Sequence, residues 1–338
     1  MIGSLFKRAP GHAAAPGWLA IELGKTSVRL THVRPDGTRP VVDFAEKRDW
    51  NPSEPKSLQR IAREFDARRF RCTTLLEPAQ YQILLVEAPA VKRDELKAAL
   101  RWRIKDMLDY PVDDATVDML DVPLPASAGQ HERKMYAVTA RSETLRLAAA
   151  PFDKAGIALA VIDIPDTAQR NLAALFEAEQ RGVAALTFDE GGGLITVTFG
   201  GELYLSRRLD ISADEVIDSV GKYQAPAEDS LVLEDDEGRS RLLDRVLVET
   251  QRSLDACERA YSFFSIGRVL LGPMPEESGL REHLAANLYI PVETMDLAKV
   301  LRLPKGSAAW TPTEATRWVQ LIGAGLRSED APLSAVLE

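Results

Sequence analysis

The length, composition and charge of the chain exclude several classes of protein. Its 338 residues are 45% hydrophobic and 28% charged, which suits a soluble globular protein with more than one ordinary domain. A formal net charge of −9 argues against a nucleic-acid partner. Cys72 and Cys257 lie far apart in the sequence, so they indicate reduced thiols in a cytosolic protein rather than a disulfide framework.

The sequence carries no signal for a membrane span. No apolar run approaches the roughly 18–20 residues that a transmembrane helix needs. Residues 1–16 are rich in Ala, Gly and Pro and lack the apolar region of a signal peptide. We therefore expect a flexible N-terminal lead.

The first structured stretch predicts a β-hairpin around a glycine. Residues 18–23 are mostly apolar, and Gly24 can take the positive φ that a sharp reversal needs. Lys25, Thr26 and Ser27 add one cation and two hydroxyls at the turn. Such a turn can present backbone N–H groups to a phosphate. The alternative is an ordinary hairpin with a solvated polar tip.

The rest of the first half predicts a sheet, a helix and a smaller module. An Asp-Gly turn separates strands over 28–34 and 41–45, and apolar spacing predicts a helix over 55–68. From Cys72 onward the pattern indicates an α+β module inserted into a larger domain. Its expected strands cover 73–76, 82–86, 116–122, 135–139 and 157–164, and its expected helices cover 94–108 and 142–154.

The helix expected over 94–108 has one large aromatic side chain that does not lie on its apolar face. Two acidic residues fall in its first turn, where the helix dipole favours anions. Trp102 lies off the apolar stripe, between Arg101 and Arg103. An alternative to a functional role is that Trp102 packs on a neighbouring strand.

The second half repeats the pattern of the first hairpin. A strand over 183–188 leads into Asp189-Glu190-Gly191-Gly192-Gly193, and a further hairpin follows. An acidic residue two positions before a glycine occurs at Glu22 and again at Asp189, which suggests a diverged duplication. We expect helices over 166–180, 212–220, 277–288 and from Thr311, a solvated acidic loop over 225–239 before a long helix, and strands over 269–271 and 291–293. Gly323 and Gly325 in the last helix would let another element pack close.

This order of elements resembles a known superfamily. Two halves, each with an acid-x-Gly turn in its first hairpin, resemble the actin/Hsp70/sugar-kinase superfamily, and the inserted module resembles its FtsA and PilM branch. Several motifs are similar to the MshI family, the PilM-like biogenesis proteins of the MSHA type IV pilus: LAIELG at 19–24, YQILLVEAP at 81–89, AALRWRIKD at 98–106, GELYLSRR at 201–208 and ETQRSLD at 249–255. The resemblance covers about Trp18 to Leu326.

The resemblance implies a mixed α/β fold, namely a bilobal actin-like (ribonuclease-H-like duplicated) fold with an inserted α+β subdomain. The implied parts are an N-terminal lead over 1–16, a first lobe over 17–70 completed by 165–182 and 312–328, an inserted subdomain over 71–164, a second lobe over 183–207 and 264–311, a helical subdomain over 208–263 and a tail over 329–338.

The resemblance also implies a function as a binding protein. A PilM-like protein is cytoplasmic and associates with the cytoplasmic face of the inner membrane without spanning it. It holds the cytosolic N-terminal tail of a bitopic PilN-like protein, in a groove between the first subdomain and the inserted one. It thereby joins the pilus assembly platform beside the motor ATPase. Arg101, Trp102 and Arg103 are the expected contacts, because Trp and Arg are common interface anchors.

A second implication is a site for ATP and Mg²⁺ built from two glycine turns and an adenosine turn. The positions that match are Glu22, Gly24, Lys25, Thr26, Ser27, Arg29, Asp189, Gly191, Gly192 and Gly272. Asp189 would hold the metal through the nucleotide, since carboxylates are Mg²⁺ ligands.

The residues depart from the superfamily pattern in each of these motifs. Glu22 replaces the usual Asp, and its extra methylene shifts the carboxylate on a scale that matters for phosphoryl transfer. Arg29 occupies the usual Lys position, and Leu194-Ile195 lack the hydroxyls that follow the second turn. Gly272-Pro273 replaces a run of glycines, which removes a backbone donor. We therefore expect a degenerate ATP site and no catalytic residue.

Two other functions remain open from the sequence. One is an active ATPase or nucleotide-gated switch of the same pilus complex, which would require ATP and Mg²⁺. The other is the cytosolic domain of a GspL-like type II secretion protein. The four histidines are scattered without metal-ligand or triad spacing, which argues against a hidden hydrolase.

Overall fold

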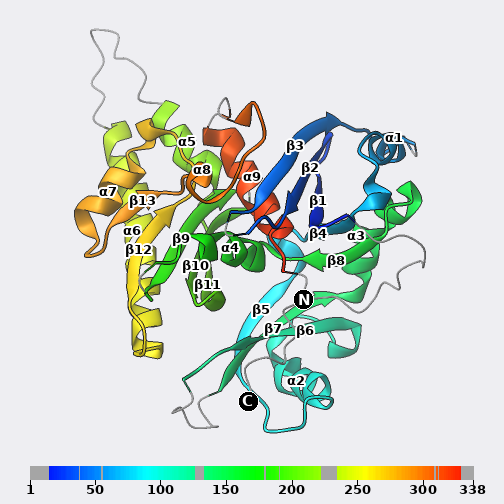
Figure 1. The fold of residues 1–338 in the computed structure, drawn as a ribbon. Helices are drawn as coiled ribbons and strands as arrows, with labels where there is room; N and C mark the ends of the chain where they lie inside the picture. The colour runs from blue at the N-terminus through cyan, green and yellow to red at the C-terminus, as the bar shows by residue number, and fades with distance from the viewer. Residues whose placement is uncertain are drawn as a thin grey trace. The chain divides into compact units, whose positions relative to one another are not determined.

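The structure of the chain is a computed structural model that describes residues 15–37, 39–54, 56–125, 133–178, 180–189, 191–221, 234–307, 310 and 312–328. The chain divides into two compact units (Figure 1). Unit 1 comprises Met1–Ala168 and Leu321–Glu338, and unit 2 comprises Gln169–Gln320.

Unit 1 is built on a five-stranded sheet with the order β3-β2-β1-β4-β8. Its strands are β1 (Trp18–Leu23), β2 (Ser27–Arg34), β3 (Val41–Asp49), β4 (Arg71–Leu75) and β8 (Leu159–Asp163). The first three strands form an antiparallel meander, while β4 and β8 run parallel to β1. The central strand β1 is buried from Trp18 to Ile21, as a strand covered on both faces requires.

Four of the described helices contribute residues to unit 1 beside this sheet. They are α1 (Ser57–Glu64) and α3 (Ser142–Ala155), together with α4 (Pro165–Ala173) and α9 (Pro312–Gly325), which contribute residues to both units. Short 3₁₀ turns lie at Ala67–Arg69 and Pro78–Gln80. The close approach that we expect at Gly323 is confirmed, because a Cβ there would lie 2.1 Å from the carbonyl oxygen of Ala168.

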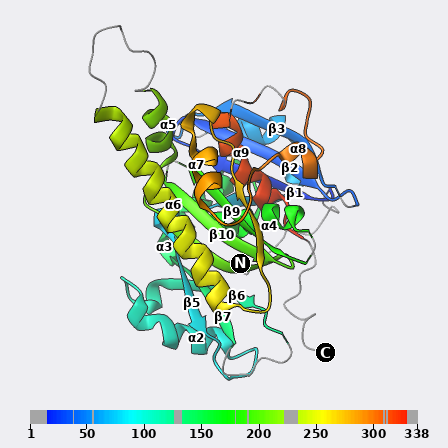
Figure 2. The same ribbon diagram turned by 90° about the vertical axis from the view of Figure 1, so that its left-hand side faces the viewer.

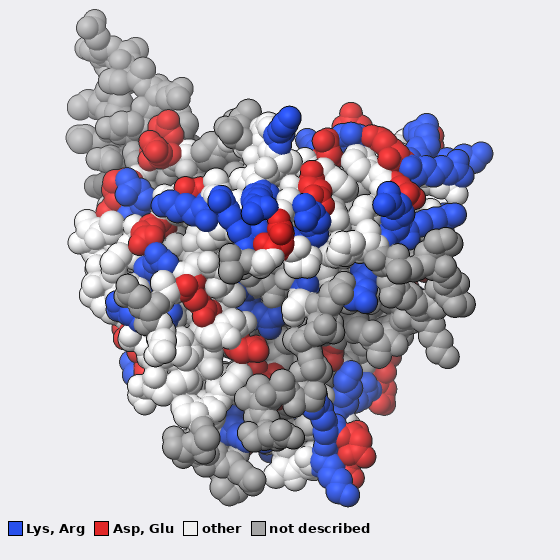
Figure 3. Space-filling view, viewed as in Figure 1, with Lys and Arg blue, Asp and Glu red and all other residues white. Residues whose placement is uncertain are grey.

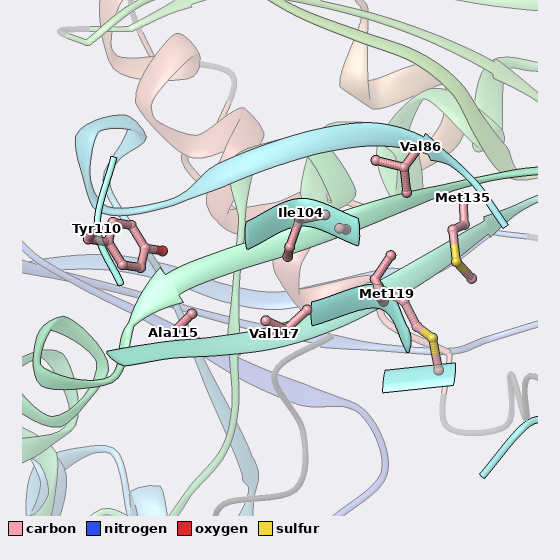
Figure 4. Close-up of a cluster of buried hydrophobic side chains, with 9 residues drawn as sticks. Val86, Ile104, Tyr110, Ala115, Val117, Met119 and Met135 are labelled. Atoms are coloured by element: carbon pink, nitrogen blue, oxygen red, sulfur yellow. The ribbon is translucent and has the colours of Figure 1, made fainter. Parts of the chain in front are cut away.

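A second sheet in unit 1 forms the inserted subdomain. Its order is β5-β7-β6, from β5 (Gln82–Glu87), β6 (Ala115–Val122) and β7 (Lys134–Arg141), all antiparallel. Helix α2 (Leu96–Ile104) packs on one face, with 3₁₀ turns at Lys105–Met107 and Val112–Asp114. The subdomain has its own core, which Figure 4 shows: Val86, Leu100, Ile104, Tyr110, Ala115, Val117, Met119, Met135 and Ala137.

Unit 2 repeats the strand order of the first sheet. Its order is β11-β10-β9-β12-β13, from β9 (Gly182–Asp189), β10 (Gly192–Phe199), β11 (Glu202–Leu209), β12 (Ile266–Leu271) and β13 (Val292–Thr294). The first three strands are again antiparallel, and β12 and β13 again run parallel to the central strand β9. The expected duplication is thus visible in the topology.

Helices accompany this second sheet. They are α5 (Ala213–Gly221), α6 (Glu234–Ala260), α7 (Leu280–Asn287) and α8 (Leu297–Val300), with 3₁₀ turns at Ala174–Phe176 and Glu276–Ser278. Helix α6 is the long rod that is prominent in Figure 2. Within the described residues, none of the helices is both long and apolar enough to cross a membrane.

The inserted subdomain is smaller than the predicted module over 71–164. Strands β4 and β8, which fall at the two ends of that range, pair inside the first sheet instead. The physical reason is that parallel pairing joins strands that are distant in sequence, so local patterns do not reveal the partner. The prediction is therefore corrected at both ends, and the separate sheet runs only from β5 to β7.

Several predicted element ends are wrong. Helix α1 stops at Glu64 rather than 68 because Asp66 takes a left-handed conformation with φ of 47°. Helix α2 spans Leu96–Ile104 rather than 94–108, so its first turn holds no acidic residue. Helix α4 ends at Ala173 instead of 180, and Gly279, with φ of 65°, delays α7 to Leu280.

The acidic run at 234–237 is also not a loop. Helix α6 begins at Glu234, so residues 234–239, the last part of the loop expected over 225–239, are helical instead. Acidic side chains suit the first turn of a helix, where the dipole is positive. Residues 222–233 lie outside the described part, as do residues 1–14, the expected helix start at Pro55 and the capping residue Thr311.

Candidate functional site

The first glycine turn in unit 1 is closed by its own backbone. The Gly24 N–H donates to the Ser27 carbonyl oxygen at 2.8 Å, so this donor does not face a ligand. Trp50 braces the turn from the end of β3, because its indole Nε1 donates to the Gly24 carbonyl at 2.8 Å and its backbone N–H donates to the Thr26 carbonyl at 3.0 Å. Lys25 and Thr26 are exposed.

Two details of this turn differ from the sequence expectation. Gly24 does not have a positive φ, so that prediction is wrong, and the four residues from Gly24 to Ser27 form a wider reversal. The sequence does not predict the bracing by Trp50. Its only sequence signal is an aromatic residue directly after the third strand, and that pattern is not specific.

The acid and the cation of the first turn bind each other. Glu22 and Arg29 are directly opposite in the β1–β2 ladder. The Arg29 Nη1 donates to Glu22 Oε2 at 2.7 Å, and the Arg29 side chain is only 11% exposed. In the predicted site, Glu22 would face a metal ion and Arg29 a phosphate. Here each satisfies the charge of the other.

The acidic residue of the second glycine turn, Asp189 in unit 2, is also bound within its own unit. The Gly191 N–H donates to Asp189 Oδ1 at 2.7 Å, which forms a short Asx turn. The other carboxylate oxygen of Asp189 lies 3.7 Å from Arg208 Nη1. Gly192 has a φ of 121°, and a Cβ there would lie 2.6 Å from the Leu209 carbonyl oxygen, so β11 requires glycine at this position.

The predicted adenosine turn is tied to the second sheet. The Gly272 N–H donates to the Leu186 carbonyl at 2.7 Å, and a Cβ on Gly272 would lie 2.9 Å from Thr187 Cγ2. The hydroxyl of Thr316 donates to the Pro273 carbonyl. A cavity beside Gly272, Met274 and Pro275 has a volume of about 20 Å³, room for about one water molecule. Close packing on Thr187 therefore explains Gly272 without a nucleotide.

A larger open pocket lies along α7, still in unit 2. Its volume is about 350 Å³, and its lining comes from α6, α7 and the residue that precedes α7: Ser240, Leu243, Gly279, Glu282, His283, Ala286 and Asn287. His283 Nε2 lies 3.0 Å from Asp244 Oδ1. The sequence does not predict this pair, because Asp244 lies on α6 and is distant from His283 in the chain.

The three residues of α2 that we expect to contact the partner have different environments. Arg101 is structural, since it donates to the Ala115 carbonyl at 2.8 Å and to the Val112 carbonyl at 2.6 Å. Arg103 Nη1 donates to Glu87 Oε2 at 2.8 Å. Trp102 is 72% exposed. The alternative that Trp102 packs on a neighbouring strand is therefore wrong.

The surroundings of Trp102 are mixed in charge. Lys105 Nζ lies 5.1 Å from the centre of the Trp102 ring, which is a cation–π distance. Met107, in the 3₁₀ turn that follows α2, is 47% exposed. Figure 3 shows Lys and Arg interspersed with Asp and Glu over the face that it views. The helix α2 thus presents a large apolar side chain among charged ones.

The thiols do not offer a nucleophile. Cys72 and Cys257 are both free and buried, as expected for reduced cysteines. Burial raises the pKa of each thiol to about 12, so both stay protonated at neutral pH. No group of three or more His, Cys, Asp or Glu side chains within the described residues could hold a metal ion.

Comparison with known proteins supports the fold. No family model matches the chain, and no curated protein matches it by sequence. A solved structure described as a PilM-PilN type IV pilus biogenesis complex is similar, with a TM-score of 0.69 and 18% identity over 92% of this chain and 99% of that chain.

Two further solved structures match with lower scores. A Bacteroides thetaiotaomicron protein described as having an actin-like ATPase fold has a TM-score of 0.46 and 10% identity over 90% of this chain and 95% of that chain. The cytoplasmic domain of EpsL, an inner-membrane component of the Vibrio cholerae type II secretion system, has a TM-score of 0.42 and 12% identity over 91% and 94%. The repeated strand order and the similarity to the pilus complex together establish an actin-like fold with an inserted α+β subdomain.

Proposed function

We propose that this protein is an actin-like scaffold of a type IV pilus assembly platform, of the MSHA type. In this role it binds the cytosolic N-terminal tail of a PilN-like inner-membrane protein at the cytoplasmic face of that membrane, beside the motor ATPase. The fold similarity to a PilM-PilN complex over nearly the whole chain supports the partner class. The observation that carries the proposal is the exposure of Trp102, 72%, on the inserted subdomain.

Trp102 has the properties of an interface anchor. A tryptophan side chain buries a large apolar area when a partner covers it, and truncation of such an anchor typically costs ~2 kcal/mol or more of binding free energy. Lys105 already lies against the ring, and Arg103, also on α2, pairs with Glu87 at the end of β5. This arrangement of an apolar anchor with charged neighbours is typical of the centre and rim of a protein–protein interface.

The two glycine turns support a degenerate nucleotide site. Glu22 is paired with Arg29 in unit 1, and Asp189 is engaged by Gly191 and Arg208 in unit 2. Binding of Mg²⁺ and phosphate would have to break these contacts first. The free energy needed to break these contacts and the close packing at Gly272 favour a peptide-holding scaffold over an ATPase.

The test is binding of a fluorescent peptide with the cytosolic tail of the PilN-like protein, followed by anisotropy. Trp102→Ala should weaken binding at least ~10-fold, which corresponds to ~1.4 kcal/mol. Tyr289→Ala is the matched control, because Tyr289 is an aromatic residue of unit 2 that is 55% exposed. Equal affinity of the Trp102→Ala variant would remove Trp102 from the interface. Failure of the wild-type protein to bind the tail would overturn the proposed partner.

A second candidate function is a nucleotide-gated switch of the same complex. The observation that favours it is the pocket of about 350 Å³ between α6 and α7, which is large enough for a small ligand. Glu282 and His283 supply polar groups at its wall. This candidate would retain the partner tail and add a ligand that regulates it.

A further inference from the structure

The inserted sheet ends in a strand whose outer side has no strand partner. Strand β5 is at the edge of the order β5-β7-β6. Its register with β7 is unbroken from the pair Gln82–Thr139 to the pair Glu87–Lys134. Among the described residues, no strand pairs with the other side of β5. An edge of this kind presents a row of backbone donors and acceptors.

The hydrogen bonding shows which residues face outward. The Ala88 N–H donates to the Arg133 carbonyl at 2.8 Å, and this pair continues the β5–β7 register by one residue. In an antiparallel ladder, residues that exchange hydrogen bonds alternate with residues that do not. Val86 and Leu84 therefore bond to β7. The backbone N–H and C=O groups of Ile83, Leu85 and Glu87 point away from it.

Strand β5 has only one of the usual protections of an edge, the charged Glu87 at its end. Its sequence, Gln-Ile-Leu-Leu-Val-Glu, contains no Lys or Pro, and its register contains no bulge. Leu85 is 41% exposed, although it lies in the middle of the strand. The opposite edge strand β6 differs, since it carries Asp118 and Asp121 and is buried along most of its length.

We propose that the outer side of β5 is a strand-addition site, where an extended segment of the partner tail pairs with Ile83, Leu85 and Glu87 as a fourth strand. This inference rests on the proposed function and specifies how the tail is held. Main-chain hydrogen bonds would supply affinity. The exposed Leu85 would contact a side chain of the added segment that lies on the same face of the sheet. The side chain of Glu87 is already fixed by Arg103, so it marks one end of the site.

The length of the edge favours a peptide over a second copy of this chain. Strand β5 has six residues, which span ~20 Å at ~3.4 Å per residue. Pairing two such strands alone buries far less than the ~1,200–2,000 Å² of a stable protein–protein interface. An extended tail can exploit a short edge, because it continues along the surface beyond the strand.

The first test compares two substitutions at one position with the labelled tail peptide. Leu85→Ala and Leu85→Pro both remove the exposed side chain, but only proline removes the outward N–H and adds a ring there. We expect Leu85→Pro to bind at least ~10-fold more weakly than Leu85→Ala. Circular dichroism and urea unfolding of both variants check that the inserted sheet is intact. Equal affinities of two folded variants would overturn the proposal.

The second test needs no variant of the protein. A series of tail peptides, each with a single N-methylated backbone amide, is titrated against the wild-type chain. Strand addition predicts losses at alternate residues, because only every second amide faces β5. A uniform or random pattern would overturn the inference while leaving the proposed function in place, whereas no binding by the unmodified tail would count against both. If Leu85→Pro instead abolishes self-association in sedimentation without changing tail binding, a second copy occupies the edge and the proposal is wrong.

Discussion

A buried ion pair joins the segment after α9 to the first sheet of unit 1. Asp163, at the end of β8, and Arg327 are 2% and 8% exposed and form a direct hydrogen bond. Burial opposes ionisation of Asp163, but the Arg327 charge, the Thr167 hydroxyl and the Ile164 N–H outweigh it, so the pKa of Asp163 lies below its usual range. The Arg327 guanidinium also lies 5.3 Å from the centre of the Trp18 ring.

Removing this partner should have an effect that depends on pH. Arg327→Met leaves a buried carboxylate without its counter-charge, which should cost ~3–5 kcal/mol of unfolding free energy at pH 7. The lowered pKa of Asp163 means that the wild-type pair stabilises the fold above about pH 4 and loses this effect as the pH falls further. In the variant the Arg327 charge no longer offsets the effect of burial, so the pKa of Asp163 should rise and the deficit should shrink as the pH falls from 7 towards 4.

Urea unfolding of both proteins at several pH values measures this effect. The double variant Asp163→Asn, Arg327→Met is the control, because it has no carboxylate to leave unpaired and should show a deficit that is independent of pH. A deficit of the single variant that stays constant over this range would contradict the role assigned to the ion pair.

At the scale of elements, the crossing of α9 over α4 depends on a missing side chain. A Cβ on Gly323 would lie 2.1 Å from the Ala168 carbonyl oxygen and 2.7 Å from its carbonyl carbon. These are backbone atoms, so a methyl group forces the two helices apart. Gly323→Ala should destabilise the protein by ~1–3 kcal/mol despite the better helix propensity of alanine.

The same substitution elsewhere provides a matched control. Gly238 lies in α6, and a Cβ there would meet no atom within 4 Å. Gly238→Ala should therefore stabilise the protein by up to ~1 kcal/mol, because alanine favours the helix and restricts the unfolded chain. Thermal and urea unfolding of both variants would show opposite signs. Two changes of the same sign would refute the close approach.

The elements also show what the sequence could and could not predict. The acid-x-Gly hairpins and the helix around Trp102 follow from local patterns, because period and turn chemistry are local properties. The membership of β4 and β8 in the first sheet could not be predicted this way, because parallel pairing is set by contacts distant in sequence. The end of α1 depends on the left-handed Asp66, which aspartate tolerates but does not require.

Some features of the candidate site, too, could be predicted from the sequence and others could not. The positions of Glu22 and Asp189 at equivalent turns could be predicted from the motif alone. The ion partner of Asp189 could not, because Arg208 comes from β11, a strand beyond the immediate hairpin of Asp189. Arg101 looked like an exposed contact by helical spacing, yet its side chain caps carbonyl groups of the segment that follows the helix.

At the scale of the whole molecule, the two units keep one topology while each modifies its glycine turn. Both sheets have the same strand order and the same mix of antiparallel and parallel pairs. In each, the acid of the turn lies near an arginine of its own unit, Arg29 in one and Arg208 in the other. This shared arrangement supports the proposed scaffold role, because in each half the acid that would face a metal nucleotide lies beside an arginine.

This view predicts that Mg-ATP and Mg-ADP do not stabilise the protein. A ligand at 100 times its dissociation constant adds ~2.7 kcal/mol to the unfolding free energy, which shifts the melting temperature of a protein of this size by several degrees. We expect no shift at millimolar nucleotide in thermal unfolding and no heat in calorimetric titration. A shift would instead favour the nucleotide-gated switch. Asp189→Ala and Glu282→Ala would then locate the ligand: loss of the shift in Asp189→Ala alone would place phosphates at the second turn, whereas loss in Glu282→Ala would place the ligand in the pocket between α6 and α7.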